Sequence, residues 1–251
     1  RGLGDVYKRQ VYADQSKYLD RANEISKYLN IEITIEIPSH GSLLQINDKG
    51  ISFIEDLTNT SNILYIDFLS GPMGWRLKRS DHETLLKKTL GKNKDILTIF
   101  DGTGGFLSDA LIFLALGHKV IACEQSKIVF LLVKDAINRA KTELPYLENL
   151  TLLNKNSVDV YKDIDIDIDL IYLDPLYPEI KKNVLRSGNM NIIRTILEIE
   201  NIQESPDDLF FDIKEFGYKK IVLKRPIKAE VLDKNINYQV KGKSTRFDIY
   251  I

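Results

Sequence analysis

The sequence is poor in the residue types that build disulfide frameworks and zinc sites. Its 251 residues include a single cysteine, Cys123, so no disulfide can form within the chain, and we expect a reducing, cytoplasmic setting. The three histidines, His40, His82 and His118, lie far apart and make no recognisable zinc spacing with one cysteine. We therefore expect no metal site.

Long apolar runs and a strong excess of one charge are also lacking. No run approaches the roughly 20 apolar residues of a membrane-spanning helix, so we expect no membrane partner. The formal net charge is −1, which argues against nucleic-acid binding through overall charge but allows a local basic face. The length and the 43% of hydrophobic residues suit one large domain with a smaller appendage.

The first part of the chain predicts a small α+β domain with antiparallel character over residues 11–75. Residues 1–10 show no clear period, and we expect a non-native or disordered tail there. A helix is expected from Asp14 or Ser16 to about Tyr28. Strands are expected at 11–13, 31–37, 42–46, 51–54 and 62–68.

A glycine-rich basic segment, residues 70–80, comes next. It holds the only tryptophan, Trp75, and the cations Arg76, Lys78 and Arg79. Because Lys and Arg meet phosphates and an aromatic ring can stack on a base, the segment predicts a loop that contacts RNA. The alternative is a linker whose tryptophan packs inward.

The rest of the chain, residues 76–251, is expected to form a second domain. After a helix over 83–90, strands alternate with helices, and this order predicts an α/β fold with helices on both faces of a mostly parallel sheet. The fold class is Rossmann-like, with antiparallel C-terminal strands. Strands are expected at 96–100, 119–123, 150–153, 170–173, 219–224, 238–240 and 246–251, and helices at 107–116, 126–140 and 190–198.

Two strand ends predict a cofactor pocket. The loop Asp101-Gly-Thr-Gly-Gly105 follows one strand and opens a helix, and its glycines let a ligand approach the backbone. It is neither the dinucleotide fingerprint nor a phosphate loop. Glu124 ends the next strand, where an acid can accept hydrogen bonds from both ribose hydroxyls. Two carboxylates suit a cationic cofactor without phosphate, and S-adenosylmethionine has a sulfonium, an ammonium and a ribose.

The segment Asp174-Pro-Leu-Tyr177 ends the strand at 170–173. It resembles the Asp/Asn-Pro-Pro-Tyr/Phe motif of methyltransferases that act on planar exocyclic nitrogens, with Leu176 in place of the second proline. Such an amine is a poor nucleophile, because its lone pair is delocalised into the ring. A carboxylate or carbonyl at Asp174 and Pro175 can accept its hydrogens and orient the lone pair, and Tyr177 can stack on the base. We predict these three residues as catalytic.

Over roughly residues 60–251, and in outline over 11–60, the chain resembles one bacterial family, the small-subunit (16S) ribosomal RNA guanine-N2 methyltransferase J family. The motifs that carry the resemblance are Ile66-Asp-Phe-Leu-Ser-Gly71, Asp101-Gly-Thr-Gly-Gly105, Ser108-Asp-Ala110, Ala122-Cys-Glu124, Tyr172-Leu-Asp-Pro-Leu-Tyr-Pro178 with Lys181-Lys182, Val222-Leu-Lys-Arg-Pro226 and Lys241-Gly-Lys-Ser-Thr-Arg-Phe-Asp-Ile-Tyr250.

The resemblance implies a class I methyltransferase fold and methylation of a guanine N2 amine in 16S ribosomal RNA, with S-adenosylmethionine as cofactor. The partner would be the RNA or the small ribosomal subunit. Cofactor contacts are expected at Asp101, Gly102, Gly104, Ser108, Asp109, Glu124, Gln125, Asn156, Ser157 and Asp174. RNA contacts are expected at Arg76, Lys78, Arg79, Lys181, Lys182, Lys224, Arg225 and Arg246.

Two other functions stay open. The motif at Asp174 also fits methylation of another exocyclic amine: adenine N6, cytosine N4 or a protein glutamine. Departures from the family at Ser108 and Gln125 keep open a second alternative, a non-catalytic RNA-binding module on the same fold.

Several single residues also have a second interpretation. Asp109 could be a first-turn acid that favours the helix dipole, Lys224 and Arg225 a structural ion pair, and Arg246 part of a solvated hairpin. The alternating aspartates from Asp163 to Asp169 predict a solvated edge and not a metal site.

Overall fold

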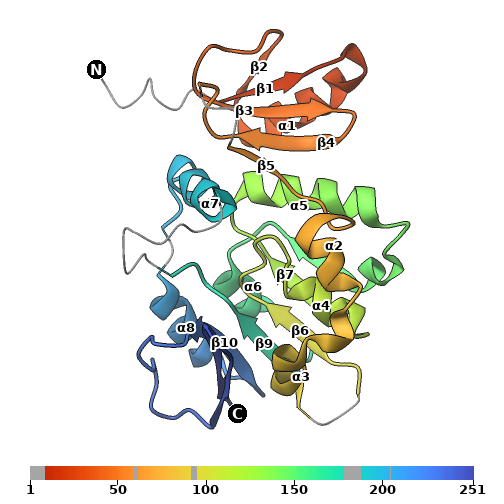
Figure 1. Cartoon of the computed structure of the whole chain (residues 1–251). Coiled ribbons are helices and arrows are strands. Elements are labelled where there is room, and N and C mark those ends of the chain that lie inside the picture. The colour runs from red at the N-terminus through yellow and green to blue at the C-terminus, as the bar shows by residue number, and fades with distance from the viewer. Residues whose placement is uncertain (1–8, 59–61, 92–94, 178–187, 204) are drawn as a thin grey trace. The chain divides into compact units, whose positions relative to one another are not determined.

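The computed structural model describes residues 9–58, 62–91, 95–177, 188–203 and 205–251 of the chain (Figure 1). By its contacts the chain divides into two compact units. Unit 1 comprises the described residues up to Phe68, Ser126–Ala140 and 188–203, and unit 2 comprises the described residues of Leu69–Gln125, 141–177 and 205–251. The domain boundary predicted between residues 75 and 76 remains a prediction, because each unit draws on several segments.

Unit 1 is built on a five-stranded sheet in the order β2-β1-β3-β4-β5. The strands are β1 (Arg9–Ala13), β2 (Glu32–Thr34), β3 (Ser42–Asn47), β4 (Gly50–Ile54) and β5 (Ile63–Tyr65), and the helices are η2 (Ser16–Tyr18), α1 (Leu19–Leu29), α5 (Lys127–Ala140) and α7 (Gly188–Ile199). The predicted antiparallel character is right for β3, β4 and β5. It is wrong for β1, which pairs in parallel with β2 and β3, since α1 carries the chain across between β1 and β2.

Unit 2 contains a seven-stranded sheet in the order β11-β12-β10-β9-β6-β7-β8. The strands are β6 (Thr98–Asp101), β7 (Lys119–Cys123), β8 (Leu150–Leu153), β9 (Leu170–Leu173), β10 (Ile221–Pro226), β11 (Tyr238–Lys241) and β12 (Thr245–Tyr250). The five strands from β10 to β8 pair in parallel, while β12 is antiparallel to both β10 and β11. This confirms the predicted Rossmann-like sheet with antiparallel C-terminal strands.

The strand order of unit 2 reverses between β6 and β9, and this locates the site. From β6 the chain proceeds to β7 and β8 on one side, and from β9 it proceeds to β10 on the other. In open α/β sheets, ligands bind outside the carboxyl ends of the strands at such a switch point. The carboxyl ends of β6 and β9 are therefore the place to look for function.

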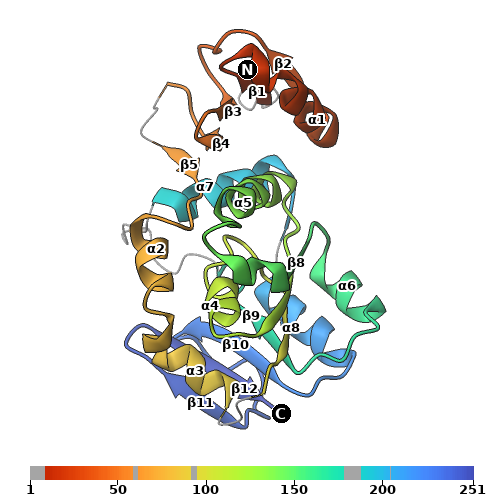
Figure 2. The ribbon, with the colours of Figure 1, turned by 90° about the vertical axis from the view of Figure 1, so that its right-hand side faces the viewer.

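Helices cover both faces of the unit 2 sheet (Figure 2). The helices are α2 (Gly71–Leu77), η3 (Ser80–His82), α3 (Thr84–Leu90), α4 (Ala110–Ala115), η4 (Pro145–Asn149), α6 (Ser157–Asp163) and α8 (Pro206–Glu215). Phe100 of β6 packs on Tyr161 of α6, and Tyr172 of β9 packs on Phe113 of α4. Because Phe100 is in register with Ile171, the strand neighbour of Tyr172, these two ring pairs lie on opposite faces.

The helices of the structure differ from the expected ones at several places. Gly71–Leu77 form helix α2 and not a loop. Proline is tolerated in the first turn of this helix, because backbone N–H groups there have no acceptor within the helix and the missing N–H costs no hydrogen bond. Trp75 on this helix is 63% exposed, so the inward-packed alternative is wrong. Helix α4 begins later than predicted, since Leu107 has a positive φ of 58°. Helices α6 and α8 lie where the sequence pattern predicts no helix. Within the described ranges, no helix has the length and apolar character to cross a membrane.

Candidate active site

The last residue of β6 and the glycine loop after it form the centre of the candidate site. Asp101 is only 2% exposed. Gly102 N donates to Tyr172 O at 3.1 Å and Gly104 N donates to Cys123 O at 2.8 Å, which ties the loop to β9 and β7. A Cβ on Gly104 would lie 2.8 Å from that same Cys123 oxygen, so the close approach of the two backbones requires glycine.

Thr103 joins the carboxylate of Asp101 to the backbone of Asp174. Its N and Oγ1 donate to Asp101 Oδ1 at 2.9 and 3.2 Å, and Oγ1 accepts from Asp174 N at 2.7 Å. Burial disfavours the charged carboxylate and raises the pKa of Asp101 from 3.8 to about 7, although the Thr103 bonds oppose this. A cation bound beside Asp101 would favour its ionised form.

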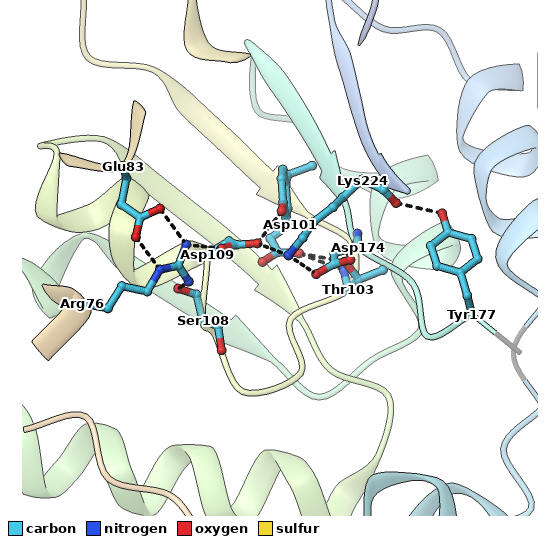
Figure 3. A network of polar contacts seen from close by, with 10 residues as sticks. Arg76, Glu83, Asp101, Thr103, Ser108, Asp109, Asp174, Tyr177 and Lys224 are labelled. Atoms are coloured by element: carbon cyan, nitrogen blue, oxygen red, sulfur yellow. Dashed lines mark hydrogen bonds and ion pairs between the residues drawn. The ribbon is translucent and has the colours of Figure 1, made fainter. Parts of the chain in front are cut away.

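The buried Asp109 lies at the centre of a network of ion pairs whose other charged members are partly exposed (Figure 3). Its Oδ1 accepts from Arg76 at 2.7 Å, and its Oδ2 accepts from Lys224 Nζ at 2.8 Å and from the Tyr172 hydroxyl. Arg76 also donates to both carboxylate oxygens of Glu83, at 2.6 and 3.1 Å. Burial favours the neutral carboxyl, but Lys224 and Arg76 outweigh it and hold the pKa of Asp109 at about 2. Three protein side chains thus engage this carboxylate, and it makes no side-chain cap to α4.

Lys224 connects Asp109 to the motif Asp174-Pro-Leu-Tyr177 (Figure 3). Its Nζ donates to Asp174 Oδ2 at 2.7 Å, and its backbone oxygen accepts from the Tyr177 hydroxyl at 2.9 Å. Burial raises the pKa of Asp174, and the Lys224 ammonium opposes the rise. Both ends of the motif are therefore fastened to one residue of β10.

A second group of predicted cofactor positions gathers at the ends of β7 and β8. Asn154 Nδ2 donates to the backbone oxygens of Glu124 and Gln125, at 2.7 and 3.1 Å. Asn156 Nδ2 donates to Gln125 Oε1 at 3.2 Å, and its Oδ1 caps α6, the helix that begins with Ser157. These four predicted residues, Glu124, Gln125, Asn156 and Ser157, thus belong to two neighbouring strand ends.

The predicted cations of helix α2 and the residues that follow it have two different environments. Lys78 and Arg79 are exposed, and the Arg79 guanidinium lies 4.8 Å from the ring centroid of the exposed Trp75. Arg76 is instead turned toward the ion-pair network, where it also donates to the backbone oxygen of Ser108 at 2.8 Å. Lys181 and Lys182 lie outside the described residues. The exposed part of α2 is therefore the Trp75 side.

Arg225 and Arg246 are buried, at 7% and 4% exposure. Arg246 donates to both carboxylate oxygens of the fully buried Asp248, at 2.8 and 3.1 Å, and to four backbone oxygens. The expectations of an RNA contact or a solvated hairpin at Arg246 do not fit this burial, because the guanidinium is already committed to the buried carboxylate. Arg225 lies 5.1 Å from the Tyr177 ring centroid and 3.8 Å from an oxygen of Asp207.

Sequence reasoning missed three residues of the network: Thr103, Tyr172 and Glu83. Tyr172 could have been noticed, because a tyrosine inside a fully buried strand needs a hydrogen-bond partner for its hydroxyl. Its partner, Asp109, is 63 residues away, and Glu83 stands 7 residues from Arg76 across the turn between α2 and α3. No local pattern signals these pairings.

The donor set at the switch point suits a cationic nucleoside. Carboxylates of Asp101, Glu124 and Asp174 stand at the carboxyl ends of β6, β7 and β9. Acidic side chains at such ends accept from ribose hydroxyls and attract a positive charge, whereas they repel a phosphate. In the part of the chain that the structure describes, no group of three or more His, Cys, Asp or Glu is arranged to hold a metal ion, the aspartates from Asp163 to Asp169 included.

Comparisons with known proteins agree over most of the chain. Residues 28–251 match the model of a family described as "Putative SAM-dependent methyltransferase". A solved SAM-dependent methyltransferase from Neisseria gonorrhoeae superimposes with a TM-score of 0.70 at 22% identity, covering 96% of this chain and 95% of that one. This structural likeness establishes the class I methyltransferase fold.

Two curated relatives carry the name ribosomal RNA small subunit methyltransferase J. The protein from Desulfotalea psychrophila is 29% identical over 243 residues, which is 93% of this chain and 92% of the relative. That from Francisella tularensis subsp. novicida is 29% identical over 239 residues, 92% of this chain and 96% of the relative. With the family model matching nearly the whole chain, the protein belongs to this family of SAM-dependent methyltransferases.

Proposed function

We propose that this protein methylates the exocyclic N2 amine of a guanine in 16S ribosomal RNA, with S-adenosylmethionine as the methyl donor. The observation that carries the proposal is Asp174 at the carboxyl end of β9 beside the glycine loop, where Lys224 holds its carboxylate and Thr103 Oγ1 accepts from its backbone N–H. Family membership and the name that the relatives carry support it. Since the substrate is ribosomal RNA, the site of action is the cytoplasm.

The residues at the ends of β6, β7 and β8 fit the cofactor. The glycine loop would accommodate it against the backbone, Asp101 would attract its positive charge, and Glu124 would accept from the ribose hydroxyls. The remaining positions proposed for cofactor contact are Gly102, Gly104, Ser108, Gln125, Asn156, Ser157 and Asp174. When bound, the cofactor supplies a methyl group on a sulfonium, whose carbon–sulfur bond breaks with its electron pair left on sulfur. We give Asp109 a supporting role, because protein side chains already occupy its carboxylate.

Asp174 orients the target amine in this proposal. Its carboxylate accepts one N–H of the amine and directs the nitrogen lone pair at the methyl group. As the new nitrogen–carbon bond forms, the nitrogen becomes positively charged and gives its proton to the carboxylate, which passes it to water. The Asp174 side chain is 38% exposed, which provides that route. Tyr177 supplies a ring for stacking on the base, with its hydroxyl fixed to β10.

The exposed side of α2 is the proposed RNA surface. Trp75 offers a large ring to a base, and Lys78 and Arg79 offer cations to phosphates. Arg246 is left out of this surface because it is buried against Asp248. Lys224 is also left out of this surface, because its ammonium lies between two carboxylates.

Calorimetric titration with S-adenosylmethionine and a methyl-transfer assay on small ribosomal subunits or their RNA test the proposal together. Wild-type protein should bind the cofactor and transfer the methyl group. Asp174→Ala should bind RNA and keep the fold, but lose about 10²–10⁴-fold in rate, because it lacks the group that orients the amine. Wild-type rates in this variant would refute the role of Asp174.

The two alternatives give different results in the same assays. A methyl group on adenine N6, cytosine N4 or a protein glutamine would leave the cofactor and the Asp174 chemistry in place and replace the substrate. Absence of S-adenosylmethionine and S-adenosylhomocysteine binding would favour a non-catalytic RNA-binding module on this fold.

A further inference from the structure

The position of Lys224 is not the one expected of a lysine that contacts RNA. Its side chain is 26% exposed, and its ammonium lies between two carboxylates, 2.7 Å from Asp174 Oδ2 and 2.8 Å from Asp109 Oδ2. A phosphate arriving from solvent would meet these carboxylates beside the ammonium and be repelled by them. The geometry instead directs the charge of Lys224 inward, toward Asp174 (Figure 3).

Asp109 holds the Lys224 ammonium in this position. The carboxylate is buried at 7% exposure and is fixed on its other side by Arg76 and by the Tyr172 hydroxyl. Arg76 itself forms a bidentate ion pair with Glu83, which restricts the rotation of its side chain. The contacts that run from Glu83 through Arg76 to the buried Asp109 therefore fix the position of the Lys224 ammonium beside Asp174.

Lys224 contacts the motif Asp174-Pro-Leu-Tyr177 at both ends. The ammonium holds Asp174 Oδ2, and the backbone oxygen of the same residue accepts from the Tyr177 hydroxyl at 2.9 Å. The Asp174 backbone is held separately, by Thr103 Oγ1. Among the residues that the structure describes, Asp174 Oδ1 has no side-chain donor, so it is the oxygen left for a substrate.

We propose that Lys224 is a positioning residue for methyl transfer, which keeps the Asp174 carboxylate ionised and turned so that Oδ1 accepts the N–H of the target amine. This inference rests on the proposed function, since it assigns a residue to the same site. It gives Lys224 a role in the rate of the reaction at a given pH and no role in RNA affinity.

The electrostatic reason is that Asp174 lies among other acids. The charged and titratable groups that face it are Lys224 of β10, Arg76 of α2, Asp109 before α4, Asp101 of β6, Tyr172 of β9 and Tyr177 of its own loop. Burial and the neighbouring Asp109 favour protonation of Asp174, whereas Lys224 and, less strongly, Arg76 oppose it. A protonated Asp174 would present a hydroxyl group in place of one acceptor and could not take the amine proton.

Lys224→Gln tests the charge, because glutamine keeps a hydrogen-bond donor and removes the ammonium. The rate of methyl transfer is measured from pH 5 to pH 9 in single turnovers with cofactor and RNA saturating. Wild type should lose rate toward low pH as Asp174 becomes protonated, and Asp174→Asn should lack this acid limb. In Lys224→Gln the limb should move to higher pH by one unit or more, which is about a tenfold loss at a fixed pH on the limb, and the rate should recover at pH 9. Lys224→Arg should keep the limb where wild type has it.

Two further measurements distinguish this positioning role from a phosphate contact and from a loss of folding. The salt dependence of RNA binding should be the same in Lys224→Gln and wild type, whereas loss of a phosphate contact would reduce its slope by about one. An unmoved acid limb would overturn the inference, and a reduced slope in addition would restore the RNA contact. If Lys224→Gln does not fold at the assay temperature, Lys224→Arg decides, because a displaced limb in that charge-conserving variant contradicts the inference. An inactive wild type refutes the proposed function itself, whatever the variants do.

Discussion

Replacing Asp101 by asparagine should remove a pH dependence from the stability of the protein. Burial raises the pKa of Asp101 from 3.8 to about 7, so the folded protein binds a proton that the unfolded chain has already lost. The contribution of this group to stability is therefore intact below pH 4 and falls as the pH rises toward 7. At about 1.4 kcal/mol for each pH unit, the loss amounts to at most about 4 kcal/mol. The asparagine side chain would keep the Oδ1 acceptor for Thr103 and cannot ionise.

Urea unfolding of wild type and Asp101→Asn at pH 5, 6, 7 and 8 measures this effect. The difference in unfolding free energy between the two proteins should grow by about 2–3 kcal/mol from pH 5 to pH 8, in favour of the variant. Asp165→Asn, at an exposed carboxylate in the loop after α6, is the matched control and should show no such trend. Parallel pH curves for wild type and Asp101→Asn would refute the buried, protonated Asp101.

The same group links pH to cofactor binding. A sulfonium beside Asp101 favours the carboxylate, so binding of S-adenosylmethionine should release the proton and tighten by about tenfold from pH 6 to pH 8. S-adenosylhomocysteine lacks the sulfonium charge and should show a weaker trend. Calorimetry with both ligands checks this, and an equal trend in Asp101→Asn would contradict the assignment.

Two further predictions concern the proposed RNA surface and the buried ion pair between Arg246 and Asp248. Trp75→Ala should weaken binding of single-stranded ribosomal RNA segments by about 1–3 kcal/mol in a filter or fluorescence assay, because stacking is lost. Phe211→Ala, at an aromatic residue of α8 that is 42% exposed, is the control and should bind as wild type does. Equal affinities for all three proteins would contradict the proposed RNA surface. Arg246→Ala should lower the unfolding free energy by about 3–5 kcal/mol, because it leaves the Asp248 carboxylate buried without its cation. Lys243→Ala, on the exposed turn of the same hairpin, is the control and should change the unfolding free energy little. An Arg246→Ala variant that is as stable as wild type but binds RNA more weakly would contradict the structural role.

The strands of the unit 2 sheet could be predicted from the sequence because each is a short apolar run with clear ends. The run Leu170–Leu173 ends at Asp174-Pro175, and Lys119–Cys123 ends at a charged residue, so both appear in the structure with the predicted bounds. The carboxylates at these ends follow directly, since parallel strands bring their carboxyl ends to one edge.

Helices α2 and α8 have weaker sequence signals than the strands, because each begins beside a proline, a residue that also marks turns. Gly71 and Pro72 favour a loop when read as turn residues, although proline is well tolerated in the first turn of a helix. Helix α8 begins with Ser205 as its cap and a proline after it, followed by Asp207 and Asp208, a start signal that was present in the sequence. The cap and the acidic first turn are thus a local signal for this helix.

The ion-pair network could not be predicted from the sequence, because its members are far apart along the chain. Lys224 meets Asp109 across 115 residues and Asp174 across 50, and only the sheet order brings β10 beside β9 and the start of α4. A lysine before an arginine and a proline indicates basic character, and this favoured an RNA contact. Whether such a cation faces solvent or a buried carboxylate depends on tertiary packing.

The identity of the modified nucleoside tests the account most directly. Ribosomal RNA or small subunits treated with the protein and isotope-labelled S-adenosylmethionine are digested to nucleosides and analysed by mass spectrometry. The account predicts label in N2-methylguanosine, and its loss when Asp174→Ala, folded and able to bind the cofactor, replaces wild type. Label in another nucleoside or in protein, or undiminished N2-methylguanosine with Asp174→Ala, would contradict it.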